Sequence, residues 1–192
     1  VVISETSFLK TLFPQGSTDL FLFKITSQSS LSVVLSLFNN TGVFKSPSGI
    51  LSDKSELKFD KSNLEGFNTN VIFAASSSCF SFTHLKINSV KGRFPEMKTT
   101  GSLELSNCEL NGIEAEGVSV VFLSDITEVK IYNSSFRSIK AVNAPGAIEI
   151  KLSPKLAASA KQRHSIYLID NNFYNCAADD GGALRVINLN LT

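Results

Sequence analysis

Four apolar positions recur together five times along the chain, and this repeat limits the possible folds more than any other feature. Each copy has an anchor residue, with further apolar residues two positions before it and five and eight positions after it. The anchors are Phe59, Phe82, Leu105, Ile131 and Leu168. Two positions before the anchors, in the same order, are Leu57, Phe80, Leu103, Val129 and Ile166. Five positions after them are Leu64, Ile87, Leu110, Phe136 and Phe173. Eight positions after them are Phe67, Val90, Ile113, Ile139 and Cys176. Such a repeat indicates stacked units, because one copy is too short to bury its own apolar face.

Within each copy, apolar and polar residues alternate with a period of two, which is typical of β-strands. Only residues 155–162 have a pattern that suits a helical turn. The sequence therefore predicts an all-β protein, a right-handed parallel β-helix of about six coils with roughly 23 residues per coil. A β-sandwich is the alternative, since it also uses many short strands, but it does not explain a nearly constant spacing of the same four positions.

The chain is predicted to form a single β-helix domain over residues 1–192. Its anchors lie 23, 23, 26 and 37 residues apart, and the longer steps indicate insertions at 141–145 and in a loop at 153–164. An earlier copy is expected around Leu35 and Leu37, with Asn39 following it. Residues 1–30 fit the repeat more loosely and are expected to form a cap or extra strands.

Composition is that of a globular protein, with 43% hydrophobic and 18% charged residues and a net charge of +1. Positive charges are dispersed, so no nucleic-acid partner is predicted. No apolar run approaches the roughly 18 residues that a membrane span requires, so no membrane span is predicted.

Polar residues occupy the position two after each anchor, where the strand must turn. They include Asn107, Asn133 and Asp170, and Asn39 is placed in the same position in the earlier copy. Because Asn and Asp tolerate left-handed backbone conformations, we expect a corner there, with stacked side chains of Asn107, Asn133 and Asp170 forming a ladder. A glycine precedes the following strand in four copies, and a positive φ angle is expected at Gly49, Gly117, Gly146 and Gly182.

Two segments resemble a known repeat. They are residues 136–148, which end in Pro-Gly-Ala-Ile, and residues 172–184, which contain Asn-Phe-Tyr-Asn and Gly-Gly-Ala-Leu. Both are similar to the Phe-x-x-Asn and Gly-Gly-Ala-Ile repeat of polymorphic outer-membrane adhesins, which also occurs in large surface proteins of ciliates and other protists. Ile139 and Cys176 stand where that repeat has Asn. The resemblance implies a β-helical protein outside the cell or on its surface, with a structural or adhesive role.

One pair of adjacent carboxylates, Asp179 and Asp180, could act on a polysaccharide. Glycoside hydrolysis needs two carboxylates flanking the scissile bond, so a lyase or hydrolase using these residues is the alternative function. The structural interpretation is a solvated turn before Gly181, and no catalytic residue and no enzyme activity are predicted. His84 and His164 have no companions at zinc-ligand spacing, so neither a metal nor a cofactor is predicted.

Three sequons for N-glycosylation begin at Asn39, Asn133 and Asn190. A glycan on any of them would place the chain in a secretory pathway. For Asn39 and Asn133, a glycan and a corner ladder are competing interpretations, because a buried ladder leaves no room for a sugar.

Three tyrosines, Tyr132, Tyr167 and Tyr174, are expected to point outward, either as ordinary surface packing or as a contact with a glycan or a neighbouring subunit. Three cysteines, Cys79, Cys108 and Cys176, allow at most one disulfide, and its pairing is left open.

Strand-like residues stand at both ends of the sequence, at 1–3 and 184–191, without a polar cap. Unpaired strand edges are templates for further strands. We therefore expect an extracellular or cell-surface structural or adhesive module that self-associates through its open ends into a filament, or that forms part of a longer surface protein.

Overall fold

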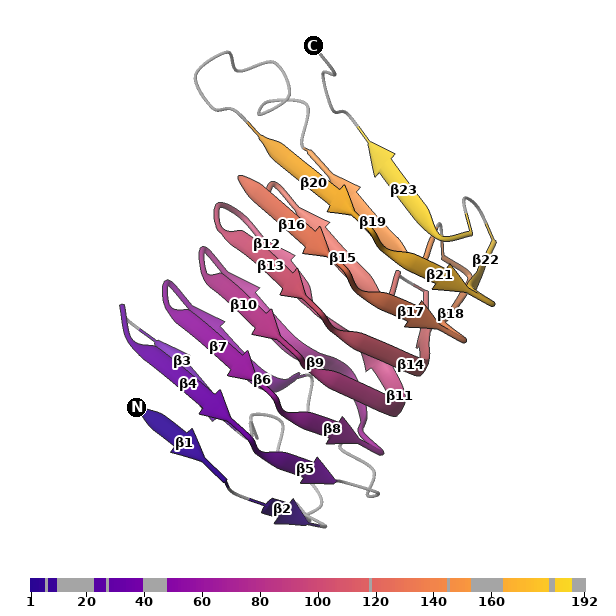
Figure 1. Ribbon diagram of the computed structural model, residues 1–192. Coiled ribbons are helices and arrows are strands. Elements are labelled where there is room, and N and C mark those ends of the chain that lie inside the picture. The colour runs from indigo at the N-terminus through magenta and orange to yellow at the C-terminus, as the bar shows by residue number, and fades with distance from the viewer. Residues whose placement is uncertain are drawn as a thin grey trace.

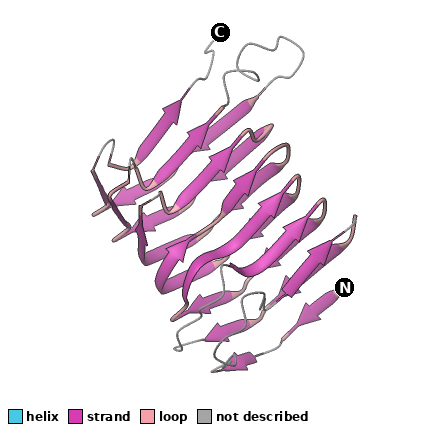
Figure 2. Ribbon diagram, turned by 180° about the vertical axis from the view of Figure 1, so that it is seen from behind, coloured by secondary structure: helices cyan, strands magenta, loops and turns pink. Residues whose placement is uncertain are grey.

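The computed structural model describes residues 1–5, 7–9, 23–26, 28–39, 48–117, 119–144, 146–152, 164–179 and 182–187. Every regular element in these ranges is a β-strand, and every described strand pair is parallel. The strands stack in levels from the N-terminal to the C-terminal end of the molecule (Figure 1). Seen from behind, the same stack continues around the far side (Figure 2). The predicted parallel β-helix is therefore confirmed as a parallel β-solenoid.

The first face is a sheet of seven strands. Its strands, in spatial order, are β1 (Val2–Ser4), β4 (Ser30–Val34), β7 (Glu56–Asp60), β10 (Cys79–Thr83), β13 (Ser102–Ser106), β16 (Glu128–Tyr132) and β20 (Ser165–Ile169). Their registers place all five predicted anchors in one column, which begins at Ile3 and Val33 and ends at Leu168. The anchors of the repeat thus lie directly above one another.

The second face carries the apolar residues that follow the anchors. Its strands are β2 (Ser7–Leu9), β5 (Leu37–Asn39), β8 (Asn63–Glu65), β11 (Lys86–Arg93), β14 (Glu109–Glu116), β17 (Ser135–Arg137) and β21 (Asn172–Tyr174), and β18 (Lys140–Val142) and β22 (Ala177–Ala178) continue beyond β17 and β21. Leu64, Ile87, Leu110, Phe136 and Phe173 form its inward column.

The third face completes each coil. Its strands are β3 (Phe23–Thr26), β6 (Ser48–Asp53), β9 (Asn68–Ser76), β12 (Glu96–Lys98), β15 (Val121–Ser124), β19 (Ile148–Lys151) and β23 (Leu184–Ile187). Because β9 also pairs with β11, the second and third faces belong to one hydrogen-bonded sheet of 16 strands.

The coil count differs slightly from the predicted six. Four turns repeat regularly between the column residues Val33 and Ile131, with steps of 26, 23, 23 and 26 residues. One longer turn lies on each side of them, so that seven strands stack in the first face. Residues 141–144 of the first predicted insertion form the end of β18 and the turn after it, whereas residues 153–163 of the second lie outside the described residues.

The earliest predicted copy was assigned to the wrong residues. Leu31 and Val33, not Leu35 and Leu37, pair with Leu57 and Phe59. Leu35 occupies the corner with φ 50° and is 52% exposed, whereas Asn39 ends β5. Apolar alternation alone could not reveal this shift of four residues, because an exposed leucine at a left-handed corner is unusual.

The corners themselves lie where they were predicted in the later copies. The residues two after the column anchors, from Glu5 to Asp170, all have φ between 47° and 54°. Each corner also links successive coils: the backbone N–H of His84, for example, donates to Ser106 O at 2.9 Å. Gly117 and Gly182 have the expected positive φ, but Gly146 does not. Gly146 instead lies in a tight place, since a Cβ there would lie 3.2 Å from Ile148 O and 3.4 Å from the backbone N of Arg185.

Aromatic rings fill the middle of the solenoid. Phe73, from the third face, packs against Phe82 and Phe59 of the first face, with ring centroids 5.0 and 5.2 Å apart. Phe82 also contacts Phe94, at 5.2 Å. Since each of these side chains is at most 1% exposed, each burial contributes about 1.5–3 kcal/mol to stability.

Next to the corner, one column inside the solenoid is mostly polar, and we call it the polar corner column. It contains Ser36, Ser62, Leu85, Cys108, Ser134 and Asn171, and all but Asn171 are buried or nearly so. Ser134 Oγ donates to Tyr132 O at 2.8 Å and accepts from the backbone N–H of Cys108 at 3.1 Å. These bonds satisfy backbone groups that the turning chain would otherwise leave unpaired.

Candidate binding surface

Only one of the two candidate catalytic carboxylates lies in the part of the chain that the structure describes. Asp179 follows β22, is exposed to solvent, and donates its backbone N–H to Ala144 O at 3.0 Å. Asp180 lies outside the described residues. The position of Asp179 is that of a residue in a solvated turn.

The corner residues Asn107 and Asn133 contact each other along the coil axis, with Asn133 Nδ2 donating to Asn107 Oδ1 at 2.6 Å. Asp170 occupies the same corner in the last coil and is exposed. Among the sequon residues, Asn133 is exposed, Asn39 ends β5, and Asn190 lies outside the described residues. A glycan on Asn133 would take one of the two hydrogens of the same amide nitrogen, so that one N–H would remain for the bond to Asn107.

All three cysteines are free thiols in different surroundings. Cys79 points outward and is exposed. Cys108 is buried in the polar corner column, and this burial raises the pKa of its thiol to about 11. Cys176 is partly buried in its apolar column, where burial also raises its pKa.

The two histidines make contacts of an ordinary kind. His84 Nδ1 lies 3.4 Å from Asp60 Oδ1 across neighbouring corners, and His164 Nδ1 lies 2.7 Å from Ile126 O. Within the described ranges, no three His, Cys, Asp or Glu side chains gather as a metal site would require. No helix long and apolar enough to cross a membrane occurs there either.

A hollow of about 350 Å³ opens on the outer surface of the first face, and we call it the lateral hollow. It exists because β10 and β13 carry the short outward side chains of Cys79, Ser81 and Ser102. Longer residues surround them: Glu56, Lys58, Glu104, Glu128 and Lys130 line the same hollow. Phe80 and Leu103 also line it, but their side chains point into the core and are 1% exposed, so they present backbone to the hollow.

Ion pairs stand on two sides of the lateral hollow. Lys58 Nζ lies 3.0 Å from Glu56 Oε1 on β7, and Lys130 Nζ lies 2.9 Å from Glu128 Oε1 on β16. The bond to Glu128 raises the pKa of Lys130, and the nearby carboxylate of Glu104 acts in the same direction. Both pairs are solvent-accessible, so they shape the rim more than they stabilise the fold.

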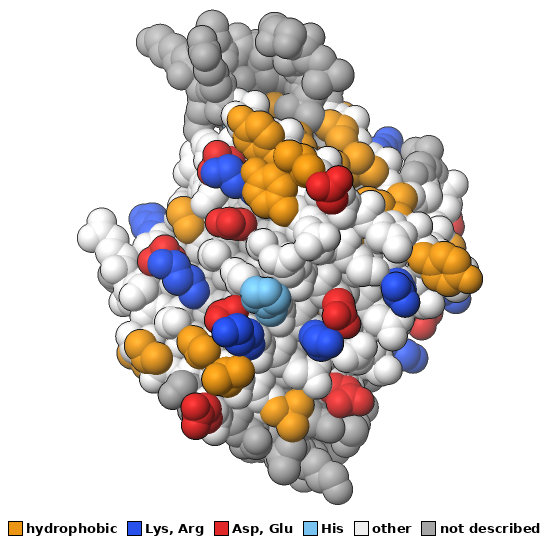
Figure 3. Space-filling view, in the orientation of Figure 1, with side chains coloured by type: hydrophobic (Ala, Val, Ile, Leu, Met, Phe, Trp, Pro, Cys, Tyr) orange, Lys and Arg blue, Asp and Glu red, His pale blue; other side chains and the backbone are white. Residues whose placement is uncertain are grey.

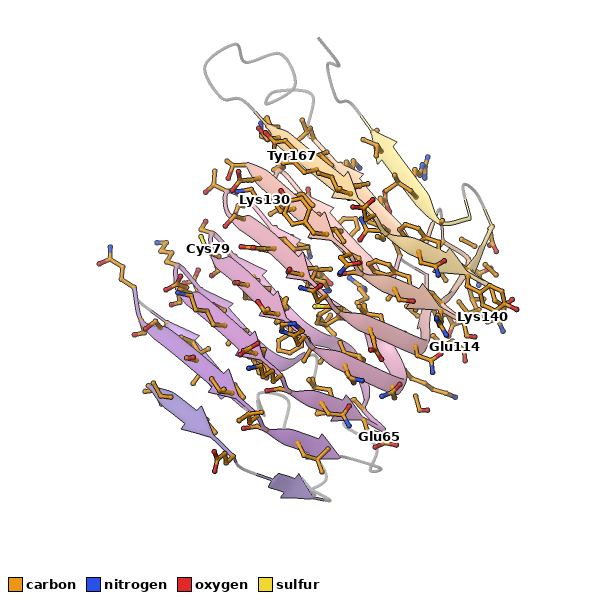
Figure 4. The ribbon with its side chains drawn as sticks, viewed as in Figure 1. Glu65, Cys79, Glu114, Lys130, Lys140 and Tyr167 are labelled. Atoms are coloured by element: carbon orange, nitrogen blue, oxygen red, sulfur yellow. The ribbon has the colours of Figure 1, made fainter. Side chains whose placement is uncertain are left out.

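Beyond the lateral hollow, toward the C-terminal end, lies a patch made of the exposed Tyr167 and Ile169 and the partly buried Tyr132, which we call the aromatic patch. Figure 3 shows apolar side chains gathered over β16 and β20. Tyr167 is 45% exposed and Ile169 is 48% exposed. Tyr167 pairs in register with Lys130, so the patch directly continues the hollow along the coil axis. Cys79, Lys130 and Tyr167 lie at successive heights of this face (Figure 4).

No protein-family model matches the chain, and no curated protein and no solved structure matches it. The comparisons therefore do not support the specific resemblance to adhesin-type repeats, and only the parallel β-solenoid fold that it implied is confirmed.

Two buried carboxylates on the third face were missed by sequence reasoning. Glu96 and Glu149 occupy outward positions but are each only 8% exposed. Glu96 pairs with Arg93 and Lys98, and Glu149 accepts a hydrogen bond from Ser119 Oγ at 3.3 Å. Buried carboxylates need such partners, which makes these pairs structural features of the coil. A basic residue three before and two after Glu96 was the only sequence signal.

Proposed function

We propose that this chain is an extracellular or cell-surface β-solenoid module with a structural or adhesive role. It would act by joining end to end into a filament or as part of a longer surface protein. The observation that carries the proposal is that the first and last described coils present strand edges and apolar columns suited to one more coil. Open edges of this kind pair with further strands.

The apolar columns continue into the last coil, but their side chains are less buried there. Ile131 and Phe136 are at most 1% exposed, whereas Leu168 and Phe173, one coil further, are only partly buried. At the other end, Val1 is 83% exposed although it precedes β1 in the inward position of Leu31. Another coil at either end would bury these side chains as neighbouring coils bury the middle ones.

The backbone of the first strand also has an unused edge among the described strands. Val1 O accepts from Ser32 N–H at 2.9 Å, so Val1 bonds toward β4. Because successive residues of a parallel strand bond to opposite sides, the N–H and C=O of Val2 point away from β4. Val2 is 73% exposed.

The last strand of the first face has the complementary edge. Ser165 N–H donates to Thr127 O at 3.0 Å, and Ile169 O accepts from Asn133 N–H at 2.9 Å. By the same alternation, Ile166 and Leu168 direct their backbone groups away from β16. If the anchor column continues from Leu168 to Ile3 of another copy, Leu168 N–H faces Val2 O and Val2 N–H faces Ile166 O. Side-chain register and hydrogen-bond register therefore agree.

The test combines sedimentation velocity with electron microscopy over a range of protein concentrations. The chain should form unbranched polymers as its concentration rises. Val2→Pro removes the edge N–H and should weaken association at least tenfold, equivalent to about 1.4 kcal/mol. Val2→Ala keeps that N–H and should retain most of the association.

A chain that stays monomeric at every concentration, with the Val2 and Leu168 amides slow to exchange with solvent, would contradict the proposal. Protection in a monomer would mean that both edges are already covered. A filament and a longer protein both need these edges accessible.

A further inference from the structure

We propose that the lateral hollow and the aromatic patch together bind a neutral, hydroxyl-rich oligosaccharide. This inference rests on the proposed function and names the ligand class for its adhesive role. It concerns the outer surface of the first face, whereas end-to-end assembly concerns the strand edges.

The lining of the hollow selects a polar ligand. Its floor offers the hydroxyls of Ser81 and Ser102, the thiol of Cys79 and the backbone of β10 and β13. No apolar side chain other than Cys79 is available there to anchor a hydrophobic peptide residue, because Phe80 and Leu103 point inward. Hydroxyl groups both donate and accept hydrogen bonds, so a sugar can satisfy serines and carboxylates at once.

The charges of the hollow disfavour anionic polymers. Three carboxylates, from Glu56, Glu104 and Glu128, face two ammonium groups, from Lys58 and Lys130. Both ammonium groups are held by carboxylates of the same rim. A phosphate, sulfate or uronate would be repelled by the net negative charge of the hollow. The hydroxyls of a neutral sugar can instead donate hydrogen bonds to the carboxylate oxygens.

The outward column gives the ligand a direction. Lys58, Ser81, Glu104, Lys130 and Tyr167 pair in register from β7 to β20. Successive members lie about 4.8 Å apart, a step similar to one sugar ring, so the column spans about 19 Å along the coil axis. A short oligosaccharide laid on this column would meet a polar group on each coil and an aromatic ring at the end.

The aromatic patch supplies the apolar contact that sugars use. The C–H face of a pyranose packs on an exposed ring, while the phenolic hydroxyl remains free to hydrogen-bond. Tyr167 is suited to this because its ring is fixed on a strand and 45% exposed. The hollow itself, at about 350 Å³, is at the lower end of the size range of small-molecule sites.

The experiment measures binding of neutral tetrasaccharides of glucose, N-acetylglucosamine and mannose by calorimetry, with heparin and polygalacturonate as the acidic comparison. We expect at least one neutral sugar to bind and the acidic ones to bind at least tenfold more weakly. Tyr167→Ala and Glu104→Gln should each reduce affinity about tenfold or more. The matched controls are Tyr174→Ala on β21 and Glu114→Gln on β14, both on the second face. They should leave the affinity unchanged, since Tyr174 is exposed, Glu114 is partly exposed, and neither residue lines the hollow.

Cys79 provides a local readout of occupancy. Its exposed thiol lines the hollow, whereas Cys108 is buried and Cys176 partly buried. Saturating sugar should slow alkylation of Cys79 by iodoacetamide severalfold and leave the other two rates unchanged. The wild-type chain and the four variants should melt at similar temperatures, because all four substitutions are on the surface.

Three results would overturn the inference: no binding of any neutral sugar at millimolar concentration, stronger binding of an acidic polymer, or equal losses in the control variants. Sedimentation of the same samples shows whether the chain polymerises, so it tests the proposed function separately from sugar binding. A chain that polymerises but binds no sugar would refute only the saccharide site.

Discussion

The middle coils and the last coil follow the same apolar pattern but differ in how well they are buried. In the middle, Phe59 and Phe82 are 1% and 0% exposed, because each has a coil on either side. In the last coil, the equivalent Leu168 and its neighbour Phe173 are only partly buried. A residue of this protein is therefore buried by the coils next to its own. Stability in such a stack is approximately the sum of the stabilities of single coils and of the interfaces between neighbouring coils.

The strongest test of this difference compares two phenylalanines. Phe82→Ala should lower the free energy of unfolding by about 3–5 kcal/mol, because it removes a fully buried ring from the middle of the stack. Phe173→Ala should cost about half as much or less, since Phe173 stacks on Phe136, at 4.8 Å, but is partly exposed. Urea unfolding followed by circular dichroism measures both. Equal losses would show that the last coil is packed as tightly as the middle.

A second test uses pH. Burial raises the pKa of Cys108 to about 11, above its ordinary value of 9.0. The unfolded chain ionises first, so the contribution of this thiol to stability is complete below pH 9 and is lost as pH rises toward 11. Between pH 8 and 10.5 the wild type should lose about 2 kcal/mol more than Cys108→Ala.

The end coil supplies the control for this prediction. Cys176→Ala should change the pH dependence less than Cys108→Ala does, because Cys176 is only partly buried. The urea midpoints of the wild type and both variants, measured at pH 8 and at pH 10.5, give the change in stability for each. A larger effect at Cys176 would mean that its thiol is more deeply buried than that of Cys108, which would contradict the proposed difference between the last coil and the middle coils.

The third comparison concerns the polar corner column, where the residue in the last coil has the smallest expected effect. Ser134→Ala removes a buried hydroxyl with two hydrogen bonds and should cost about 1–3 kcal/mol. Asn171 occupies the same column in the last coil; its amide donates to Ile131 O at 2.7 Å and accepts from Ser134 N–H at 3.0 Å. Asn171→Ala should cost about 1 kcal/mol, because water can replace its bonds at the more open end. Thermal unfolding of the two variants ranks them, and the reverse order would contradict the account.

Most of the fold could be predicted from the sequence because stacking imposes a strict rule on it. Phe59, Phe82 and Leu105 had to be apolar, since each contacts the equivalent residue above and below. The corner at Asn133 could be predicted for a similar reason, because left-handed backbone favours Asn. The prediction failed at Leu35, where a corner is occupied by a residue that resembles a core position.

The candidate surface was only partly predictable. The outward direction of Tyr167 followed from alternation, and the structure places it beside the lateral hollow. The hollow itself depends on short side chains meeting side by side on β10 and β13, and Cys79 and Ser102 are 23 residues apart in the chain. Because this adjacency depends on register, it becomes visible only once the coils are aligned.

Hydrogen exchange of the wild-type chain, followed by mass spectrometry at low and high protein concentration, tests the central claim most directly. The account predicts that β10 and β13 exchange slowly at both concentrations. It also predicts that β1 and β20 exchange rapidly when the chain is dilute and slowly when it is concentrated. Uniform protection from β1 to β20 in the dilute chain, unchanged on concentration, would show that the end coils are already closed and would contradict the account.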